Sequence, residues 1–325
     1  MRRWFAAIAV LALAAPAIPA AADDYPSRPI RVIASQGAGG LSDIWMRAVA
    51  DQMGPLLGSG ASVVIEDRTG AAGTIGARAC GEAAPDGYTF CIIPVEAVAI
   101  NPVINPVAGW DPAKSLAPVT KAFYLTQVFA VNASLGAKNF DELIKLAKAK
   151  PKTLSYMAPS ISKVAFMEEL NKNNGIDFVR VPFKGGGDAV NSMLSGTTPI
   201  AIFGIGNLVQ FLRNGQVLGY AVDGAKRSPL GPNIPTFKEL GYTQHLLPTF
   251  FGIYAPTGTP KPIIDKMNQV VVKVASDPEF QKRNMDSRGL EPVLNSPEQF
   301  AKELEVDRAD GRAAIKASGL YPDVK

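Results

Sequence analysis

The chain has 325 residues, of which 47% are hydrophobic and 19% are charged, a composition that excludes a disordered protein. Because this length exceeds the usual size of a single hydrophobic core, we expect two α/β lobes. The formal net charge of +4 falls to +2 without Arg2 and Arg3, and so small a charge offers no support for nucleic-acid or membrane binding.

The first 22 residues predict a secretory signal peptide. Arg2 and Arg3 precede an apolar run over residues 4–15, and the alanines at 20–22 offer a small-residue cleavage site. The alternative is an uncleaved membrane anchor. It is disfavoured because the apolar run is shorter than the ~20 residues of a membrane span and two prolines follow it. No cysteine follows the cleavage site, so we expect no lipid anchor.

A glycine-dense turn follows the first strand of the mature chain. Residues 32–34 are apolar and β-branched, and Gly37, Gly39 and Gly40 then let the backbone curl closely around a small ligand. The helix after the turn buries a face formed by Trp45, Ala48, Val49 and Met53. Its first N–H groups are unpaired and carry a partial positive charge, so strand, turn and helix predict an anion-binding seat.

The next elements are a strand at 62–66, a small-residue helix ending near Gly81, and a strand at 88–93. Glycines at 70, 73 and 76 resemble a dinucleotide fingerprint, but their spacing is wrong for one, so we interpret them as a tight turn with close helix packing. Cys80 and Cys91 are the only cysteines. They form either a disulfide across the intervening turn or two buried free thiols.

The middle of the chain predicts a crossing into a second lobe. Residues 94–118 contain too many prolines for long elements, and residues 126–131 then form an apolar strand. Asn139 opens a capped helix, a strand follows at 154–157, and another helix begins after Ser160.

A second glycine-rich unit lies roughly one domain length after the first. Residues 178–183 predict a strand, residues 184–187 a Lys-Gly-Gly-Gly loop, and Asp188 the start of a helix. Two anion seats on two lobes suggest one ligand held between them. Strands at 200–203 and 250–254 and two C-terminal helices complete the chain. The predicted lobes are residues 23–124 with 250–325, and residues 125–249.

Several motifs together resemble the Bug receptors, the periplasmic solute-binding components of tripartite tricarboxylate transporters. The motifs are Tyr25-Pro26-Ser27-Arg28-Pro29-Ile30-Arg31, Gly39-Gly40-x-x-Asp43, Glu66-Asp67-Arg68-x-Gly70-Ala71-x-Gly73-x-Ile75-Gly76-Ala77, Pro85-Asp86-Gly87-Tyr88-Thr89, Val181-Pro182-Phe183-Lys184-Gly185-Gly186-Gly187, Ile234-Pro235-Thr236 and Ala255-Pro256-x-Gly258-Thr259-Pro260. The resemblance covers essentially the whole mature chain.

This resemblance implies a two-lobed type II periplasmic binding protein, α/β in class, with helices flanking each sheet and a ligand cleft between the lobes. It implies capture of a small di- or tricarboxylate or aromatic carboxylate and delivery to membrane subunits of a tripartite transporter, by a monomer without cofactor or metal. The backbone grip on one carboxylate maps to Ser35, Gln36, Gly37, Ala38, Gly39, Gly40 and Asp43 in the first turn, and to Lys184, Gly185, Gly186, Gly187 and Asp188 in the second.

Four positions leave alternatives open. Glu96 would repel a carboxylate ligand unless the ligand carries an amine or Glu96 is protonated or turned away. Near Ser160 and Ser162, Lys163 is either the partner of a second carboxylate or a solvated surface lysine. Asp188 either weakens the second seat or stabilises its helix start. Phe250 is either a cleft aromatic or a packing residue of the hinge.

An enzyme is the competing class. His245 is the only histidine, so a metal cluster is excluded on ligand count and a Ser-His-Asp triad would depend on that one residue. Ser42 lacks the flanking glycine of a nucleophile elbow. A periplasmic sensor adaptor that docks on a signalling kinase would bind the same solute, and the sequence does not separate it from a transport receptor.

Overall fold

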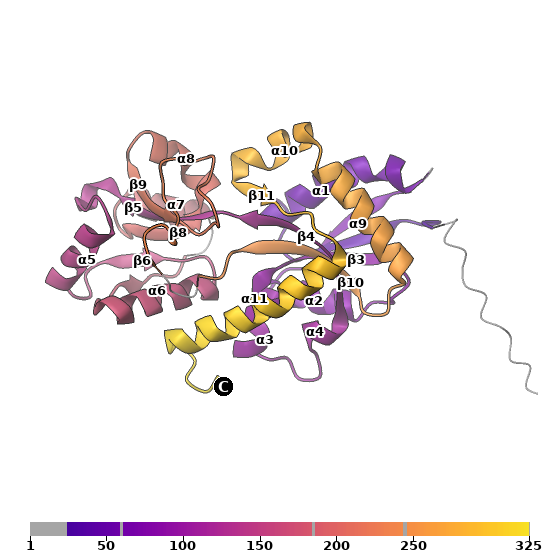
Figure 1. The fold of residues 1–325 in the computed structure, drawn as a ribbon, viewed down its shortest axis with the longest axis horizontal. Coiled ribbons are helices and arrows are strands. Elements are labelled where there is room, and N and C mark those ends of the chain that lie inside the picture. The colour runs from indigo at the N-terminus through magenta and orange to yellow at the C-terminus, as the bar shows by residue number, and fades with distance from the viewer. Residues whose placement is uncertain (1–24, 59–60, 184–185, 243–245, 325) are drawn as a thin grey trace, which may run out of the picture.

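The computed structural model describes residues 25–58, 61–183, 186–242 and 246–324, and within them the chain forms two β-sheets, each flanked by helices (Figure 1). The predicted signal peptide and His245 lie outside the described residues. No helix in the described ranges is long and apolar enough to cross a membrane.

The sheet of the first lobe has six strands in the order β11-β4-β10-β3-β1-β2. They are β1 (Ile30–Ala34), β2 (Val63–Asp67), β3 (Thr89–Pro94), β4 (Leu116–Leu125), β10 (Phe250–Pro256) and β11 (Leu290–Pro292). The strand β1 pairs in parallel with β2 and β3, whereas β10 is antiparallel to both β3 and β4. The carboxyl ends of β1 and β3 therefore lie side by side, and the turns that follow them leave from one edge.

Helices cover both faces of this sheet. The longer ones are α1 (Leu41–Leu57), α2 (Thr74–Gly81), α9 (Lys261–Ala275), α10 (Pro278–Asn284) and α11 (Pro297–Ser318). Short helical segments are η2 (Ala71–Gly73), η3 (Glu96–Ile100), α3 (Asn101–Ile104), α4 (Pro112–Ser115) and η5 (Asp286–Arg288). Val32 packs with α1 and α9 on one face, while Ile33 packs with α2 and α11 on the other. Burial on both faces explains why residues 32–34 of this strand are all apolar.

The sheet of the second lobe has five strands in the order β7-β6-β8-β5-β9. They are β5 (Gln127–Asn132), β6 (Ser155–Met157), β7 (Val179–Arg180), β8 (Ile200–Gly204) and β9 (Val217–Val222). The helices are η4 (Ala133–Leu135), α5 (Phe140–Ala149), α6 (Ile161–Asn174), α7 (Gly186–Leu194) and α8 (Ile205–Arg213). Because β6 is parallel to β7 and β8, α6 and α7 start at the same edge of the sheet.

The chain passes between the sheets twice, and the two crossing segments are hydrogen-bonded to each other. The Leu125 N–H donates to the Thr249 carbonyl at 2.8 Å, and Gln127 Nε2 donates to Thr249 Oγ1 at 2.7 Å. The long C-terminal helix α11 extends from the first lobe to α6 of the second, where the two helices pack together (Figure 1). These contacts define the hinge side of the molecule, but the exact lobe limits stay a prediction.

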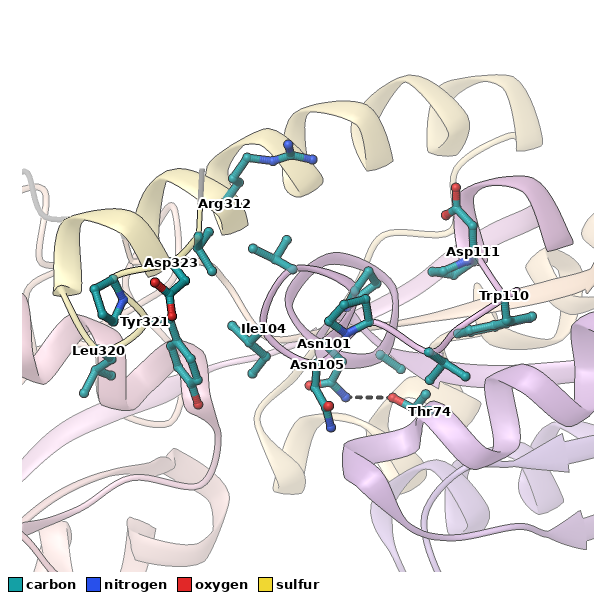
Figure 2. Close-up of a pocket in the computed structure, with 18 residues that line it drawn as sticks. Thr74, Asn101, Ile104, Asn105, Trp110, Asp111, Arg312, Leu320, Tyr321 and Asp323 are labelled. Atoms are coloured by element: carbon teal, nitrogen blue, oxygen red, sulfur yellow. Dashed lines mark hydrogen bonds between the residues drawn. The ribbon is translucent and has the colours of Figure 1, made fainter.

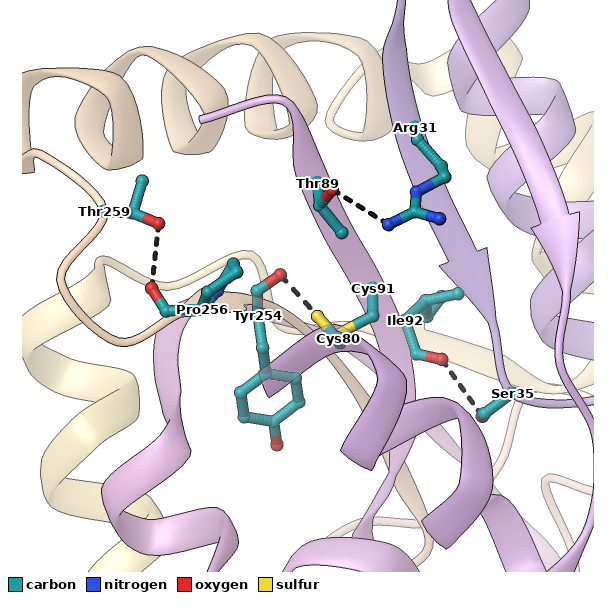
Figure 3. Close-up of a disulfide and its surroundings, with 9 residues drawn as sticks. All are labelled: Arg31, Ser35, Cys80, Thr89, Cys91, Ile92, Tyr254, Pro256 and Thr259. Atoms are coloured by element: carbon teal, nitrogen blue, oxygen red, sulfur yellow. Dashed lines mark hydrogen bonds between the residues drawn. A yellow bond between two sulfur atoms is a disulfide. The ribbon is translucent and has the colours of Figure 1, made fainter. Parts of the chain in front are cut away.

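The disulfide prediction is confirmed. Cys80 at the end of α2 and Cys91 in β3 are bonded, with an S–S distance of 2.10 Å and a Cα–Cα distance of 6.1 Å (Figure 3). The predicted turn before α2 is also confirmed, since Gly70 and Gly73 have φ of 122° and 93°. A Cβ on Gly76 would come within 2.8 Å of the Arg68 carbonyl oxygen. The helix can pack this closely because glycine has no side chain.

Two element predictions differ from the structure. The prolines of residues 94–118 predict no long element, but the ten-residue strand β4 begins at Leu116 and runs through Pro118. The strand predicted over residues 178–183 is reduced to Val179–Arg180, and the helix after it begins at Gly186 rather than at Asp188.

Candidate functional site

The first glycine turn lies at the shared carboxyl edge of β1 and β3. Ser35 is buried at its base, where its hydroxyl donates to the Ile92 carbonyl of β3 at 3.1 Å (Figure 3). Gly37, Ala38 and Gly39 are exposed, and Gly39 has a φ of 77°, a conformation that favours glycine. The backbone of the turn is therefore exposed to solvent, while Ser35 anchors the start of the turn to β3.

Asp43 and Gln36 shape this turn from within. Asp43 Oδ2 accepts from the Gly39 N–H at 2.8 Å, and its other oxygen lies 2.6 Å from Arg47 Nε. Gln36 Oε1 accepts from the Ser42 N–H at 3.2 Å. Both predicted ligand residues thus have protein partners within the turn, and their contact with a ligand stays a prediction.

The N–H groups of Ala38 and Leu41 donate to no acceptor in the described chain. The Gly40 N–H, by contrast, is used internally, because it donates to the Gly37 carbonyl at 2.8 Å. Leu41 is the first residue of the 17-residue helix α1, so these donors lie at the positive end of its dipole. The predicted anion seat would therefore have fewer free N–H donors than its number of glycines suggests.

Glu96 connects the two lobes. It directly follows β3 at the start of η3, and its Oε1 accepts from the hydroxyl of Ser162 in the first turn of α6. The Ser160 hydroxyl lies 3.0 Å from that of Ser162. Glu96 is only 6% exposed, and burial raises the pKa of its carboxyl above 4.5, against the opposing effects of the Ser162 hydrogen bond, the nearby Ser160 hydroxyl and the charge of Lys163.

Lys163 points into the second lobe. It is 0% exposed, its Nζ lies 2.9 Å from Asp223 Oδ2, and it donates to the Leu247 carbonyl at 2.6 Å. The solvated-surface alternative is therefore wrong. Its charge is already paired, so the structure gives no support to Lys163 as the partner of a second ligand carboxylate.

The second predicted anion seat lies at the start of α7. Lys184 and Gly185 lie outside the described residues. Gly186 and Gly187 form the start of α7, which is anchored by the buried side chains of Ala189 and Met193. Asp188 is exposed in the first turn of α7, where a negative charge stabilises a helix.

Phe250 is part of the first lobe's core. It is 0% exposed and lies edge-on to Tyr124 and Phe300, at ring distances of 6.3 and 6.0 Å. The Nζ atom of Lys121 lies 4.4 Å from its ring centroid. These contacts favour the packing alternative over a cleft aromatic.

A groove of about 730 Å³ lies elsewhere, between α3 with the loop after it and the end of α11 with the C-terminal tail (Figure 2). Asn101 and Trp110 line one side, and Arg312 and Tyr321 line the other. None of the predicted ligand residues lines this groove. It is therefore distinct from the region where the two sheet edges meet.

Sequence reasoning missed Asp223, the acidic partner of Lys163. Asp223 also accepts from the Gln127 N–H through Oδ1 at 2.7 Å, which ties it to the start of the crossing strand β5. Its only sequence signal is a carboxylate directly after an apolar strand, and that pattern does not identify the partner.

Two α/β sheets, joined by two crossing segments and with turn-to-helix units at facing edges, define a two-lobed binding protein. Residues 45–320 match the family described as tripartite tricarboxylate transporter family receptor, and the chain belongs to this family. BugT of Bordetella pertussis is 29% identical over 303 residues, which cover 92% of each chain. The family description names its members as receptors.

Two solved structures support the same assignment. The R. palustris protein Rpa4515 with adipate is 26% identical, with a TM-score of 0.79, and the match covers 91% of this chain and 99% of that one. MatC from Rhodopseudomonas palustris with bound malate is also 26% identical, with a TM-score of 0.74, and the match covers 90% of this chain and all of that one. The predicted family and two-lobed fold are confirmed.

Proposed function

We propose that this protein is a periplasmic receptor that captures a small organic carboxylate between its lobes and delivers it to a tripartite tricarboxylate transporter. The observation that carries the proposal is in the first glycine turn, at the start of α1. The N–H groups of Ala38 and Leu41 there have no hydrogen-bond acceptor among the described residues. The adipate and malate in the two neighbouring structures belong to the same ligand class.

A carboxylate suits such a seat for a physical reason. Backbone N–H groups at a helix start form charge-assisted hydrogen bonds with an anion, and their fixed positions keep the ordering cost of binding low. The second seat, at residues 184–188, would complete the grip from the other lobe. Closure around the ligand would then signal occupancy to the membrane subunits.

Location and partner follow from the same proposal. The predicted signal peptide at residues 1–22 would export the chain to the periplasm, where a receptor meets its transporter. The expected monomer without cofactor or metal fits a protein whose task is capture and delivery.

The turn is tested by a pair of glycine variants with equal backbone strain. Gly39 and Gly215 have φ of 77° and 76°, and a Cβ on either would meet nothing within 4 Å. Gly39→Ala and Gly215→Ala should therefore each cost about 1 kcal/mol of stability. Calorimetric titration with di- and tricarboxylates, aromatic carboxylates and amino carboxylates identifies the ligand of the unsubstituted protein.

We expect Gly39→Ala to weaken binding of that ligand at least about tenfold, because the shifted backbone misdirects the donors. Gly215, between α8 and β9, lies far from the turn in the chain and its variant should bind normally. Equal affinities in the two variants would refute the proposed seat, and a protein that binds no carboxylate would refute the proposed function.

A further inference from the structure

The contact between Glu96 and Ser162 joins the two sheet edges that carry the predicted anion seats. Glu96 follows β3, the parallel neighbour of β1, so it leaves the sheet beside the Ser35–Asp43 turn. Ser162 follows β6, the parallel neighbour of β7, so it leaves the sheet beside the start of α7. A ligand held by the first seat and facing the start of α7 would lie next to this pair.

Glu96 has one oxygen without a partner. Oε1 accepts from Ser162, but Oε2 is buried and receives no hydrogen bond from the described chain. A buried carboxylate oxygen without a donor is costly, and the cost is removed by a group that donates to it. Because Glu96 and Ser162 belong to different lobes, an opening of the lobes would separate them and uncover this oxygen.

The cation that acts on Glu96 is already paired with another carboxylate. Lys163 is the nearby cation that interacts with it, but the Lys163 ammonium lies 2.9 Å from Asp223 Oδ2 and also donates to Leu247. One buried cation therefore faces two buried carboxylates. A ligand that brings a second carboxylate to this place increases the imbalance, whereas a ligand that brings an ammonium group removes it.

We propose that Glu96 is the specificity-determining residue of the ligand site and selects an amino carboxylate over a dicarboxylate of the same length. The ligand carboxylate would occupy the first glycine turn, and its ammonium group would donate to Glu96 Oε2. This inference rests on the proposed function and narrows its ligand class. It separates this chain from the neighbouring structures with adipate and malate, which hold dicarboxylates.

The test compares dissociation constants for two ligand series matched in chain length, ω-amino carboxylates and α,ω-dicarboxylates, measured by titration calorimetry. The unsubstituted protein should bind the best amino carboxylate about ten to a hundred times more tightly than its matched dicarboxylate. Glu96→Gln should abolish this preference, since the amide carries no charge. Glu82→Gln removes the same charge from an exposed residue paired with Arg78, and it should keep the preference.

The outcomes separate the two proposals. A preference that disappears in Glu96→Gln and persists in Glu82→Gln supports the inference. Equal or tighter dicarboxylate binding by the unsubstituted protein overturns it and leaves the proposed function intact, as does a preference that survives in a folded Glu96→Gln protein. Failure to bind any member of either series, or any other carboxylate, overturns both.

Discussion

The buried ion pair between Lys163 and Asp223 makes a quantitative prediction. The two side chains are 0% and 3% exposed, and the ammonium also donates to the Leu247 carbonyl. Replacing Lys163 with Met keeps the length and shape of the side chain but removes its charge. Asp223 would then remain buried, with the Gln127 N–H as its remaining donor.

Breaking a buried pair from one side costs about 3–5 kcal/mol, because the surviving charge has lost its partner while still excluded from water. We therefore expect the free energy of unfolding of Lys163→Met to fall by about that amount in urea titrations followed by circular dichroism. The matched control is Lys172→Met on the same helix, where the lysine is exposed, and its effect should stay within about 0.5 kcal/mol.

The double variant Lys163→Met, Asp223→Asn isolates the pair. Removing both charges should recover part of the loss, so the two effects should be non-additive by at least about 1 kcal/mol. A loss below about 1 kcal/mol in Lys163→Met alone would refute this reasoning. In that case Lys163 would not be committed to Asp223, and its assignment as the partner of a second ligand carboxylate would regain support.

Two further predictions concern stability. The disulfide closes a loop with a sequence separation of 11, so replacing Cys80 and Cys91 with Ala should lower the free energy of unfolding by about 3 kcal/mol, measured in urea against the oxidised protein. An unchanged urea midpoint would contradict this. Because burial raises the pKa of Glu96 above 4.5, its native carboxyl holds a proton more tightly than the unfolded one does. The contribution of Glu96 to the free energy of unfolding is therefore largest below pH 4.5 and is lost as the pH rises through the native pKa. The melting temperature of Glu96→Gln, relative to that of the unsubstituted protein, should accordingly increase with pH. A pH-independent difference would contradict the assigned burial.

Features set by local sequence were predictable. The strand, glycine turn and helix over residues 30–57 depend on β-branching, φ at Gly39 and helical spacing, all of which are local. The sequence left two alternatives for Cys80 and Cys91, a disulfide or two free thiols. The single turn between them makes the disulfide possible but does not decide between the two. The resemblance to the receptor family then supplied the two-lobed arrangement.

Features set by tertiary contacts were not predictable. Strand β4 contains Pro118 and the buried Lys121, whose ammonium lies 2.9 Å from Glu303 and 3.0 Å from Asp307 in α11. A proline and a lysine both argue against a central strand until those partners are known. Helix α6 gives no amphipathic signal either, since Ser162 to Met167 are all buried between the second lobe's core and α11.

The first turn of α6 explains why neighbouring residues there serve different lobes. Ser162 faces Glu96 of the first lobe, whereas Lys163, one residue later, faces Asp223 inside the second. Asp223 accepts from the Gln127 N–H, and the Gln127 side chain donates to Thr249 on the other crossing segment. The Ser162–Lys163 peptide thus connects the contact with Glu96 to polar contacts that reach the two crossing segments. If a ligand ammonium donates to Glu96 Oε2, it binds the carboxylate that Ser162 also contacts, one residue away from the ion pair of Lys163 with Asp223, so ligand selection and lobe movement would share the same helix turn.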